Sequence, residues 1–310
     1  MPGTAPPRFA YLGPEGTFCE QALRTLPAAV TAVPVPCVSV ADALDAVRQG
    51  EVTAALVPLE NSIEGSVAET LDTLASGEPL HITREVLLPV SFALMGRAGT
   101  SLADVRTVTT MPHAEAQVRS FLRTSLPEAR FVAASSTAEG ARAVSAGEAD
   151  AAVAAPIAAQ RYRLDVMVDD IADNPGAVTR FVLVGRPGVP PPPTGADRTT
   201  VVAYINDDHP GALLEILTEL AVRGVNLTRI ESRPTGVGLG RYCFSFDAEG
   251  HIAQQRVGEG LAALRRICAD VRFVGSYPRA DGSPPPERTG TSDLDFRDAR
   301  AWVEALRRGE

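Results

Sequence analysis

The stretch PGVPPPPTG, residues 187–195, divides the chain into two parts with different patterns. Consecutive prolines stiffen the backbone and supply no amide donors, so they cannot continue a helix or a central strand. We therefore expect a linker over residues 188–197, between a first domain at 7–187 and a second at 198–280. A further proline run opens a polar tail over 281–310, where apolar residues at helical spacing predict a short helix that docks on the body or on a partner subunit.

Before the linker, short apolar runs alternate with helical patterns, which is typical of an α/β domain with a mainly parallel sheet. The strands expected there are Phe9–Leu12, Val35–Val38, Ala54–Leu59, Val86–Leu94, Thr107–Thr110, Arg130–Ala133, Ala151–Ala154 and Arg180–Val184. The helical patterns include Val40–Arg48, Val67–Leu74, Glu115–Leu122 and Ala138–Ser145.

Eight strands are many for one sheet in a domain of this length. The long run Leu80–Gly96 predicts a chain that crosses between two lobes, and Arg180–Val184 is then a returning strand. We expect lobes at 7–88 with 178–187 and at 89–177, resembling periplasmic binding proteins. A ligand in such a fold lies in the cleft, between strand ends and helix N-termini.

After the linker, the order of elements is β-α-β-β-α-β, the split unit of ferredoxin-like folds. The strands expected there are Thr199–Ile205, Asn226–Ser232, Tyr242–Asp247 and Val271–Gly275, with helices Gly211–Val222 and Ala253–Cys268. No nucleophile paired with a base and no metal spacing occurs in this part. The second domain therefore suggests regulation or assembly.

Composition narrows the class of protein further. The 310 residues carry a net charge of −9, which argues against a general nucleic-acid binder. The four cysteines form no C-x-x-C pair, and no apolar stretch suits a signal peptide or a bilayer span, so we expect a cytoplasmic protein without a membrane partner. The histidines have no metal spacing, so no metal site is expected, and no dinucleotide fingerprint is present.

Two helix openings in the first domain carry polar or glycine residues. The segment GPEGTF, residues 13–18, suits either an anion at a helix N-terminus or a plain strand-to-helix turn capped by Thr17. Ser136 and Glu139 make a capping box, and the same helix N-terminus would suit a carboxylate. His113 also lies at a strand-to-helix junction, where it faces either a cleft or the surface.

Two further motifs lie at ends of apolar strands. In ENSIEGS, Asn61 and Ser62 have the hydrogen-bonding groups for a ligand, although Ser62 or Ser66 is equally suited to cap the next helix. Thr179 supplies one hydroxyl donor. Arg180 supplies a charged donor fork for a carboxylate, or is a solvated arginine at a strand start.

Together these motifs resemble the prephenate dehydratase family, in order and spacing, up to about residue 276. The pieces that carry the resemblance are YLGPEGTF at 11–18, VPLENSIEG at 57–65, Ser136-Thr137, Thr179-Arg180-Phe181, GALL at 211–214 and ESRP at 231–234. The last two lie in a part that resembles the ACT domain, which senses phenylalanine in this family. The resemblance implies a monofunctional enzyme, because the chain begins at the first strand without a chorismate mutase segment.

The resemblance also implies the reaction and its residues. Prephenate loses water and carbon dioxide to give phenylpyruvate without a cofactor, a step in phenylalanine biosynthesis. Thr179 is implied as the catalytic donor to the leaving hydroxyl, and Arg180 as the residue that orients a substrate carboxylate. The remaining substrate-binding residues implied are Thr17, Asn61, Ser62, Glu64, Gly65, Ser136, Thr137 and Phe181.

For the second domain, the resemblance implies phenylalanine as effector and a homo-oligomer, a dimer or tetramer, formed through ACT domains. The effector-binding residues implied are Gly211, Ala212, Leu213, Leu214, Asn226, Glu231, Ser232, Arg233 and Pro234. Core packing is an equal alternative for Leu213 and Leu214. Arogenate as substrate and a non-catalytic two-lobed amino-acid sensor are the alternative functions.

The chain departs from the family pattern at two places. The family often has Ser-His where this chain has Cys19-Glu20, and Ser-His-Pro-Gln where it has Thr110-Met111-Pro112-His113. Because the Thr-Arg-Phe and Asn-Ser-x-Glu-Gly pieces are intact, we interpret both departures as variation around the contact residues.

Overall fold

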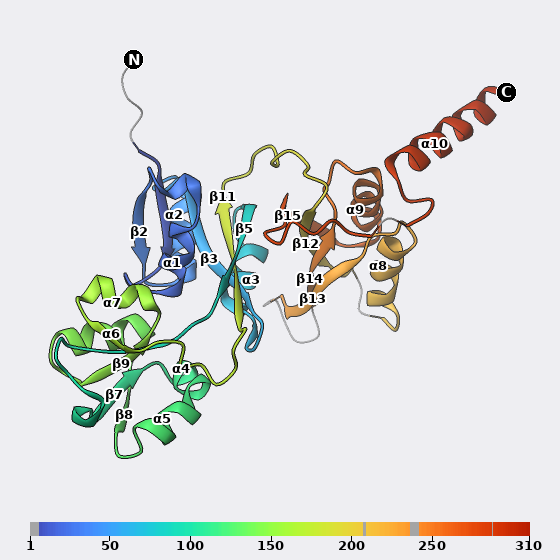
Figure 1. Cartoon of the computed structure of the whole chain (residues 1–310). Coiled ribbons are helices and arrows are strands. Elements are labelled where there is room, and N and C mark those ends of the chain that lie inside the picture. Colours follow the sequence, from blue (N-terminus) through green and yellow to red (C-terminus); the bar gives the residue numbers. More distant parts are fainter. Residues whose placement is uncertain (1–5, 207–208, 236–241, 287) are drawn as a thin grey trace. The chain divides into compact units, whose positions relative to one another are not determined.

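The computed structural model describes residues 6–206, 209–235, 242–286 and 288–310 (Figure 1). The chain forms two compact units, one of Met1–Thr70 with Val86–Leu183, and one of Leu71–Glu85 with Val184–Glu310. The strands up to the linker are β1 (Arg8–Leu12), β2 (Val33–Cys37), β3 (Ala54–Asn61), β4 (Gly65–Ser66), β5 (His81–Pro89), β6 (Ala93–Gly96), β7 (Thr107–Thr110), β8 (Arg130–Ala133), β9 (Ala151–Ala154), β10 (Asp165–Val168) and β11 (Val178–Gly185). The α-helices there are α1 (Phe18–Arg24), α2 (Val40–Arg48), α3 (Ala68–Ala75), α4 (Pro112–Gln117), α5 (Arg119–Ser125), α6 (Thr137–Ser145) and α7 (Pro156–Tyr162), with 3-10 turns at Pro27–Ala29 and Leu102–Asp104.

The first lobe is built on a sheet of order β2-β1-β3-β11-β5, with β4 paired to β3. Strand β1 is parallel to both β2 and β3. Buried side chains of these strands and of α1, among them Tyr11, Leu23, Leu56 and Phe181, form its core. Strand β11 lies between β3 and β5, so the prediction of a returning strand is confirmed.

The second lobe has its own sheet, of order β10-β6-β9-β7-β8. Strand β7 is parallel to β8 and β9, while β6 is antiparallel to β9 and β10. Helix α6 packs on this sheet through Gly140, where a Cβ would stand only 3.0 Å from the Thr109 carbonyl oxygen. The chain enters this lobe after β5 and leaves it before β11, which confirms the predicted two-lobed α/β architecture (Figure 1).

Two predicted elements in this region are wrong in extent. The strand expected at Val86–Leu94 is two strands in different sheets, because the run ends at Pro89, which has no N–H to donate, and pairing resumes only at Ala93. The helix expected at Glu115–Leu122 is two helices, α4 and α5, which meet at Val118 with φ −127°. Strands β4 and β10 and helix α7 were not predicted from the sequence.

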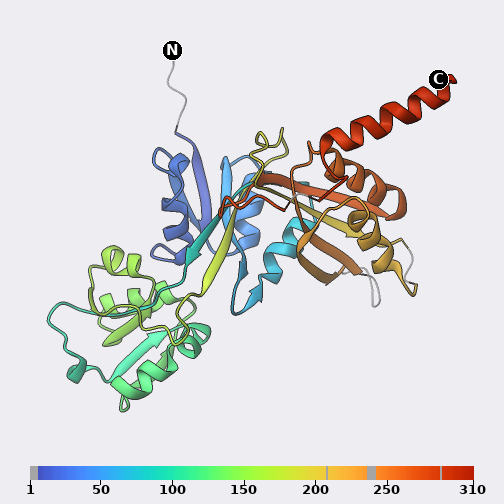
Figure 2. The ribbon, with the colours of Figure 1, turned by 45° about the vertical axis from the view of Figure 1, so that its right-hand side comes forward.

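The second unit holds an antiparallel sheet of order β13-β14-β12-β15 with two helices on one face (Figure 2). Its elements are β12 (Asp197–Tyr204), α8 (Ala212–Ala221), β13 (Leu227–Pro234), β14 (Tyr242–Glu249), α9 (Gln255–Ile267) and β15 (Asp270–Pro278). Fully buried Phe246 and Leu264 lie in its core. The ferredoxin-like β-α-β-β-α-β prediction is confirmed.

The tail forms α10 (Asp293–Arg308), begun by a capping box between Ser292 and Asp295. Its first half contacts α9, where Arg300 pairs with Glu259 at 2.7 Å. Trp302, however, is 64% exposed, so its apolar face does not dock on the body as one expectation had it.

The compact units differ from the predicted domains because Leu71–Glu85 packs with the C-terminal unit. Arg233 on β13 makes a two-pronged ion pair with Asp72 on α3, at 2.9 and 2.7 Å. Gly275 on β15 (φ +145°) touches the segment directly, since a Cβ there would stand 2.3 Å from the Ile82 carbonyl oxygen. The end of α3 and the start of β5 are therefore part of the packing of this unit.

Candidate active site

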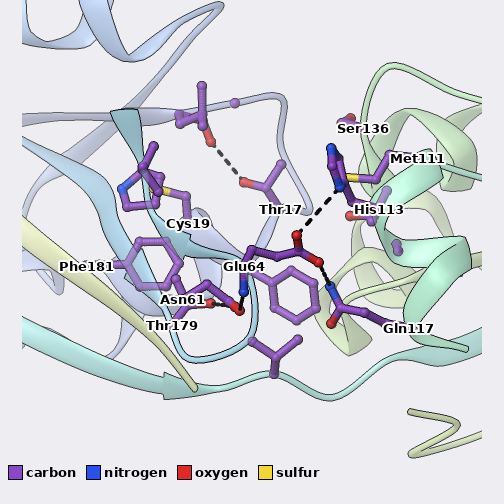
Figure 3. A pocket seen from close by; sticks show the side chains of 18 of the residues that line it. Thr17, Cys19, Asn61, Glu64, Met111, His113, Gln117, Ser136, Thr179 and Phe181 are labelled. Carbon is purple, nitrogen blue, oxygen red and sulfur yellow. Dashed lines mark hydrogen bonds and ion pairs between the residues drawn. The ribbon is translucent and has the colours of Figure 1, made fainter. Parts of the chain in front are cut away.

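A cavity of about 590 Å³ lies in the first unit and is lined from both lobes (Figure 3). Its walls combine apolar and aromatic side chains with a few hydroxyl, amide and ionisable groups. The lining residues are Leu12, Gly13, Thr17, Phe18, Cys19, Val38, Pro58, Asn61, Glu64, Val67, Val90, Phe92, Met111, His113, Ala114, Gln117, Ser135, Ser136, Thr137, Thr179 and Phe181. A cavity of this size with few polar groups is typical of a small-molecule site.

A hydrogen bond between Asn61 and Thr179 orients the Thr179 hydroxyl at the cavity. The Asn61 side-chain amide donates from Nδ2 to Thr179 Oγ1 at 2.8 Å. Its Oδ1 accepts from the backbone N–H groups of Ile63 at 2.8 Å and Glu64 at 3.1 Å, which fixes the orientation of the amide. Because Thr179 Oγ1 accepts from Asn61, the hydroxyl hydrogen is directed to another acceptor.

Glu64 connects the two lobes across the cavity (Figure 3). Its Oε1 accepts from Gln117 Nε2 at 3.3 Å, and its Oε2 lies 3.8 Å from His113 Nδ1. Both partners lie on α4 of the second lobe, one helical turn apart. Both placements expected for His113 hold, because it lines the cavity and its side chain is 73% exposed.

Thr17 and Ser136 both act as helix caps at the cavity. Thr17 Oγ1 donates to the Leu12 carbonyl at 3.0 Å and accepts from the Glu20 N–H at 3.3 Å. Ser136 accepts from the Glu139 N–H at 3.0 Å. The Glu139 carboxylate pairs with Arg142 instead, at 2.7 Å, because guanidinium on the same helix is a stronger donor. The predicted Thr17 cap is confirmed, whereas of the predicted capping box only the half made by Ser136 forms. Both residues also line the cavity.

Three predicted substrate-binding residues are not among those that line the cavity: Ser62, Gly65 and Arg180. Arg180 is neither solvated nor at the cavity, because alternation along β11 sends it to the other face from Thr179. It is 6% exposed and pairs with Glu60 at 3.2 Å. Ser62 does not supply the predicted helix cap; its Oγ accepts from the Val178 N–H at 3.0 Å, beside β11. The other predicted residues, Thr17, Asn61, Glu64, Ser136, Thr137, Thr179 and Phe181, all line the cavity.

Cys19 and Glu20, which form one of the two departures from the family pattern, have different environments. Cys19 donates from Sγ to the Leu56 carbonyl at 3.1 Å, and burial raises the pKa of its thiol to about 12, so it stays neutral. Glu20 is fully buried and accepts from the Gly16 N–H at 2.6 Å. Burial opposes its ionisation, but Arg161 and the other donors outweigh burial and hold its pKa below the usual value.

The ion pair between Arg161 and Glu20 joins the two lobes, because Arg161 belongs to α7 in the second lobe and Glu20 to α1 in the first. Arg161 Nε donates to Glu20 Oε1 at 2.9 Å. Tyr162 adds a second tie, from its hydroxyl to the Glu15 carbonyl at 2.7 Å. The turn that carries Thr17 is therefore fixed to both lobes.

Several residues that line the cavity were not predicted from the sequence. Gln117 lies four residues after His113, a spacing that puts both on one helix face, so this signal was available. Phe18 and Phe92 make an edge-to-face contact with ring centroids 5.4 Å apart, which no local pattern predicts because the two residues belong to different elements.

The residues predicted to bind an effector are spread over α8 and β13 of the second unit. Gly211 begins α8 at φ +99°, as predicted, whereas Ala212 is buried and Leu213 packs against the core. Leu214 is 66% exposed. Asn226 donates from Nδ2 to Glu249 at 3.0 Å. Glu231, Ser232, Arg233 and Pro234 lie on β13, where Arg233 holds Asp72.

A two-lobed α/β fold with a small, largely apolar cavity, followed by a ferredoxin-like module, defines the class of small-molecule-binding proteins that carry a second, separate α/β module. Sequence comparison makes this specific: the prephenate dehydratase family profile matches residues 9–188, and the ACT domain profile matches residues 200–266. A prephenate dehydratase of Amycolatopsis methanolica is 52% identical over 98% of this chain and 99% of its own length. The chain therefore belongs to the prephenate dehydratase family, a family of enzymes, and the predicted resemblance is confirmed.

Solved structures agree with this assignment. The prephenate dehydratase of Arthrobacter aurescens, crystallised with L-Phe, matches with a TM-score of 0.93 and 49% identity over 97% of this chain and 99% of that one. A protein described as a novel type of quorum quenching acylase matches with a TM-score of 0.79 and 31% identity, over 87% and 97% of the two chains. Within the described ranges, no helix is long and apolar enough to cross a membrane.

Proposed function

We propose that this enzyme converts prephenate to phenylpyruvate, water and carbon dioxide, and that Thr179 donates a hydrogen bond to the departing hydroxyl. The observation that carries this proposal is the hydrogen bond from Asn61 to Thr179 Oγ1 at 2.8 Å. A hydroxyl that accepts from an amide becomes a better donor itself, since hydrogen bonds in a chain polarise one another. A threonine hydroxyl is too weak an acid to lose its proton, so it stabilises charge on the leaving oxygen while the ring becomes aromatic.

The apolar walls support the decarboxylation. Val38, Val67, Val90, Phe92 and Phe181 line the same cavity as Thr179. An apolar wall disfavours the charged carboxylate on the ring and tolerates the neutral carbon dioxide that leaves. Binding of this kind favours the transition state over the dianionic substrate, which is the condition for a faster chemical step.

Phenylalanine is the effector we propose for the second unit. The support is the ACT match and the L-Phe complex of the Arthrobacter aurescens relative. The N-terminus of α8 at Gly211 would meet the carboxylate, and polar groups on β13 and Asn226 would meet the ammonium. We also propose that the protein assembles as a homo-oligomer through these modules, with the effector at their interface.

The experiment is a phenylpyruvate assay at neutral pH, read as absorbance in alkali, with prephenate or arogenate as substrate. Thr179→Ser keeps the hydroxyl and Thr179→Val removes it with little change in shape. We expect turnover by the wild type and the serine variant, a loss in the valine variant, and a response to phenylalanine. Turnover equal to the uncatalysed rate with both substrates would overturn the proposal and favour a non-catalytic amino-acid sensor.

A further inference from the structure

The cavity has an unusual charge for a site that takes a dianion. None of its lining residues is a lysine or an arginine, and Glu64 contributes a carboxylate of the same sign as the substrate. Arg180 is buried on the other face of β11 with Glu60. Among the residues that line the cavity, His113 is therefore the side chain that can supply a positive charge.

The contacts of Glu64 show which side chains of α4 meet a carboxylate. The Glu64 carboxylate accepts a hydrogen bond from Gln117 Nε2 at 3.3 Å and lies 3.8 Å from His113 Nδ1. Two groups one helical turn apart thus face one carboxylate that reaches them from the other lobe (Figure 3). A substrate carboxylate is the same chemical group and fits the same pair of groups.

The charged neighbours of His113 leave this pairing intact. On its own helix, Glu115 is engaged by Arg119 at 2.9 Å. From the segment before β11, Asp173 accepts from the Ser120 N–H at 2.9 Å. The ion pair described for His113 is with Glu64, from the loop after β3.

We propose that His113, as an imidazolium, binds and orients one substrate carboxylate, and that Glu64 competes with the substrate for it. This role rests on the proposed function. It makes substrate binding pH-dependent, because a neutral imidazole offers a carboxylate no positive charge, whereas both substrate carboxylates stay ionised. KM therefore rises with pH, and kcat, which reports the bound complex, changes little.

The test measures KM and kcat between pH 6 and 8.5, with the uncatalysed rate subtracted, for the wild type and four variants. For the wild type we expect KM to rise roughly tenfold over this range, as the loss of a charge-assisted hydrogen bond implies. His113→Gln removes the charge, so its KM should stay flat at the high-pH wild-type value. His113→Lys keeps a positive charge, so its KM should stay flat and low.

Two further variants separate the contributions. Glu64→Gln removes the competing carboxylate and should lower KM while KM still rises with pH. His209→Gln is the matched control, because His209 is also a partly exposed histidine paired with a glutamate, Glu215 at 3.1 Å, in the other unit. It should keep the wild-type profile.

The proposal is overturned if the wild-type KM does not rise with pH, or if His113→Gln retains the wild-type dependence. It is also overturned if the His113→Gln variant loses kcat equally at every pH with KM unchanged, which is the signature of a structural role. Failure of the proposed function looks different, since the wild type would then not turn over prephenate at any pH. The His113 side chain is 73% exposed, so these variants should fold, as thermal melts will check.

Discussion

Asn61→Asp exchanges donor and acceptor in the hydrogen bond to Thr179 with little change in the shape of the side chain. In the native chain Oδ1 accepts two backbone N–H groups, from Ile63 and Glu64, and Nδ2 donates to Thr179 Oγ1. Aspartate keeps the first oxygen and so preserves the turn. It replaces the donor by an acceptor, and the Thr179 hydroxyl then donates to the new carboxylate and no longer to the substrate.

The size of the effect follows from the loss of one positioned donor to a developing oxyanion. Such a loss lowers kcat by about 10²–10³-fold, or roughly 3–4 kcal/mol of transition-state stabilisation. The native bond is 2.8 Å long and Thr179 is 9% exposed, so water has little access to replace the donor. The added negative charge also repels a dianion, which raises KM; kcat at saturating prephenate is therefore the quantity to read.

The assay compares kcat for Asn61→Asp, Thr179→Ala and the double variant. If both changes act through one hydroxyl, the double variant is no slower than Thr179→Ala alone, because there is no donor left to misdirect. An Asn61→Asp enzyme within threefold of the wild type, or losses that multiply in the double variant, would refute the reasoning.

Three further predictions concern packing, coupling and pH. Gly275→Ala should lower the free energy of unfolding by about 2 kcal/mol or more and the Tm by several degrees, since its Cβ would stand 2.3 Å from the Ile82 carbonyl oxygen; an unchanged melt contradicts this. Asp72→Asn should leave basal turnover intact and cost about 1 kcal/mol or less, because its pair with Arg233 is partly exposed, but it should shift the phenylalanine concentration for half-maximal effect. Glu20→Gln should destabilise the protein by roughly 3 kcal/mol at pH 7, measured by urea unfolding. Because the pKa of Glu20 is lowered in the folded state, its contribution to stability is full above the usual glutamate pKa and is lost as pH falls through the folded-state value. The difference in unfolding free energy between the wild type and Glu20→Gln should therefore shrink in acid, and a difference that stays constant with pH would contradict this prediction.

Periodicity predicted most of the fold but failed where two elements share one apolar run. The stretch from β5 to β6 is one continuous apolar run, because both strands contain buried residues. Pro89 marks the boundary between them, because it has no backbone N–H to donate to a neighbouring strand. Just after the break between α4 and α5, the Ser120 N–H donates to Asp173, which lies 53 residues away in the sequence. A contact between residues so far apart in the sequence leaves no signal in the local sequence pattern.

Local patterns also predicted most of the candidate site, and they failed where the direction of a side chain decided the outcome. Strand ends and helix starts brought Thr17, Asn61, Ser136 and Thr179 to one cavity, since such termini converge at one edge of an α/β sheet. Arg180 was expected at the cavity from its residue type, but it does not line it, because the two-residue alternation of a strand sends neighbours to opposite faces.

The position of β11 has a consequence for how the protein is made. Asn61 and Thr179 are 118 residues apart, and β11 must insert between β3 and β5 after the whole second lobe has been synthesised. That lobe is continuous in sequence, so during translation it can close its own sheet while the first lobe still lacks a central strand. The step that completes the first lobe's sheet also brings in the Thr179 hydroxyl for which we propose the catalytic role. A nascent chain therefore acquires its proposed chemistry only when β11 has paired.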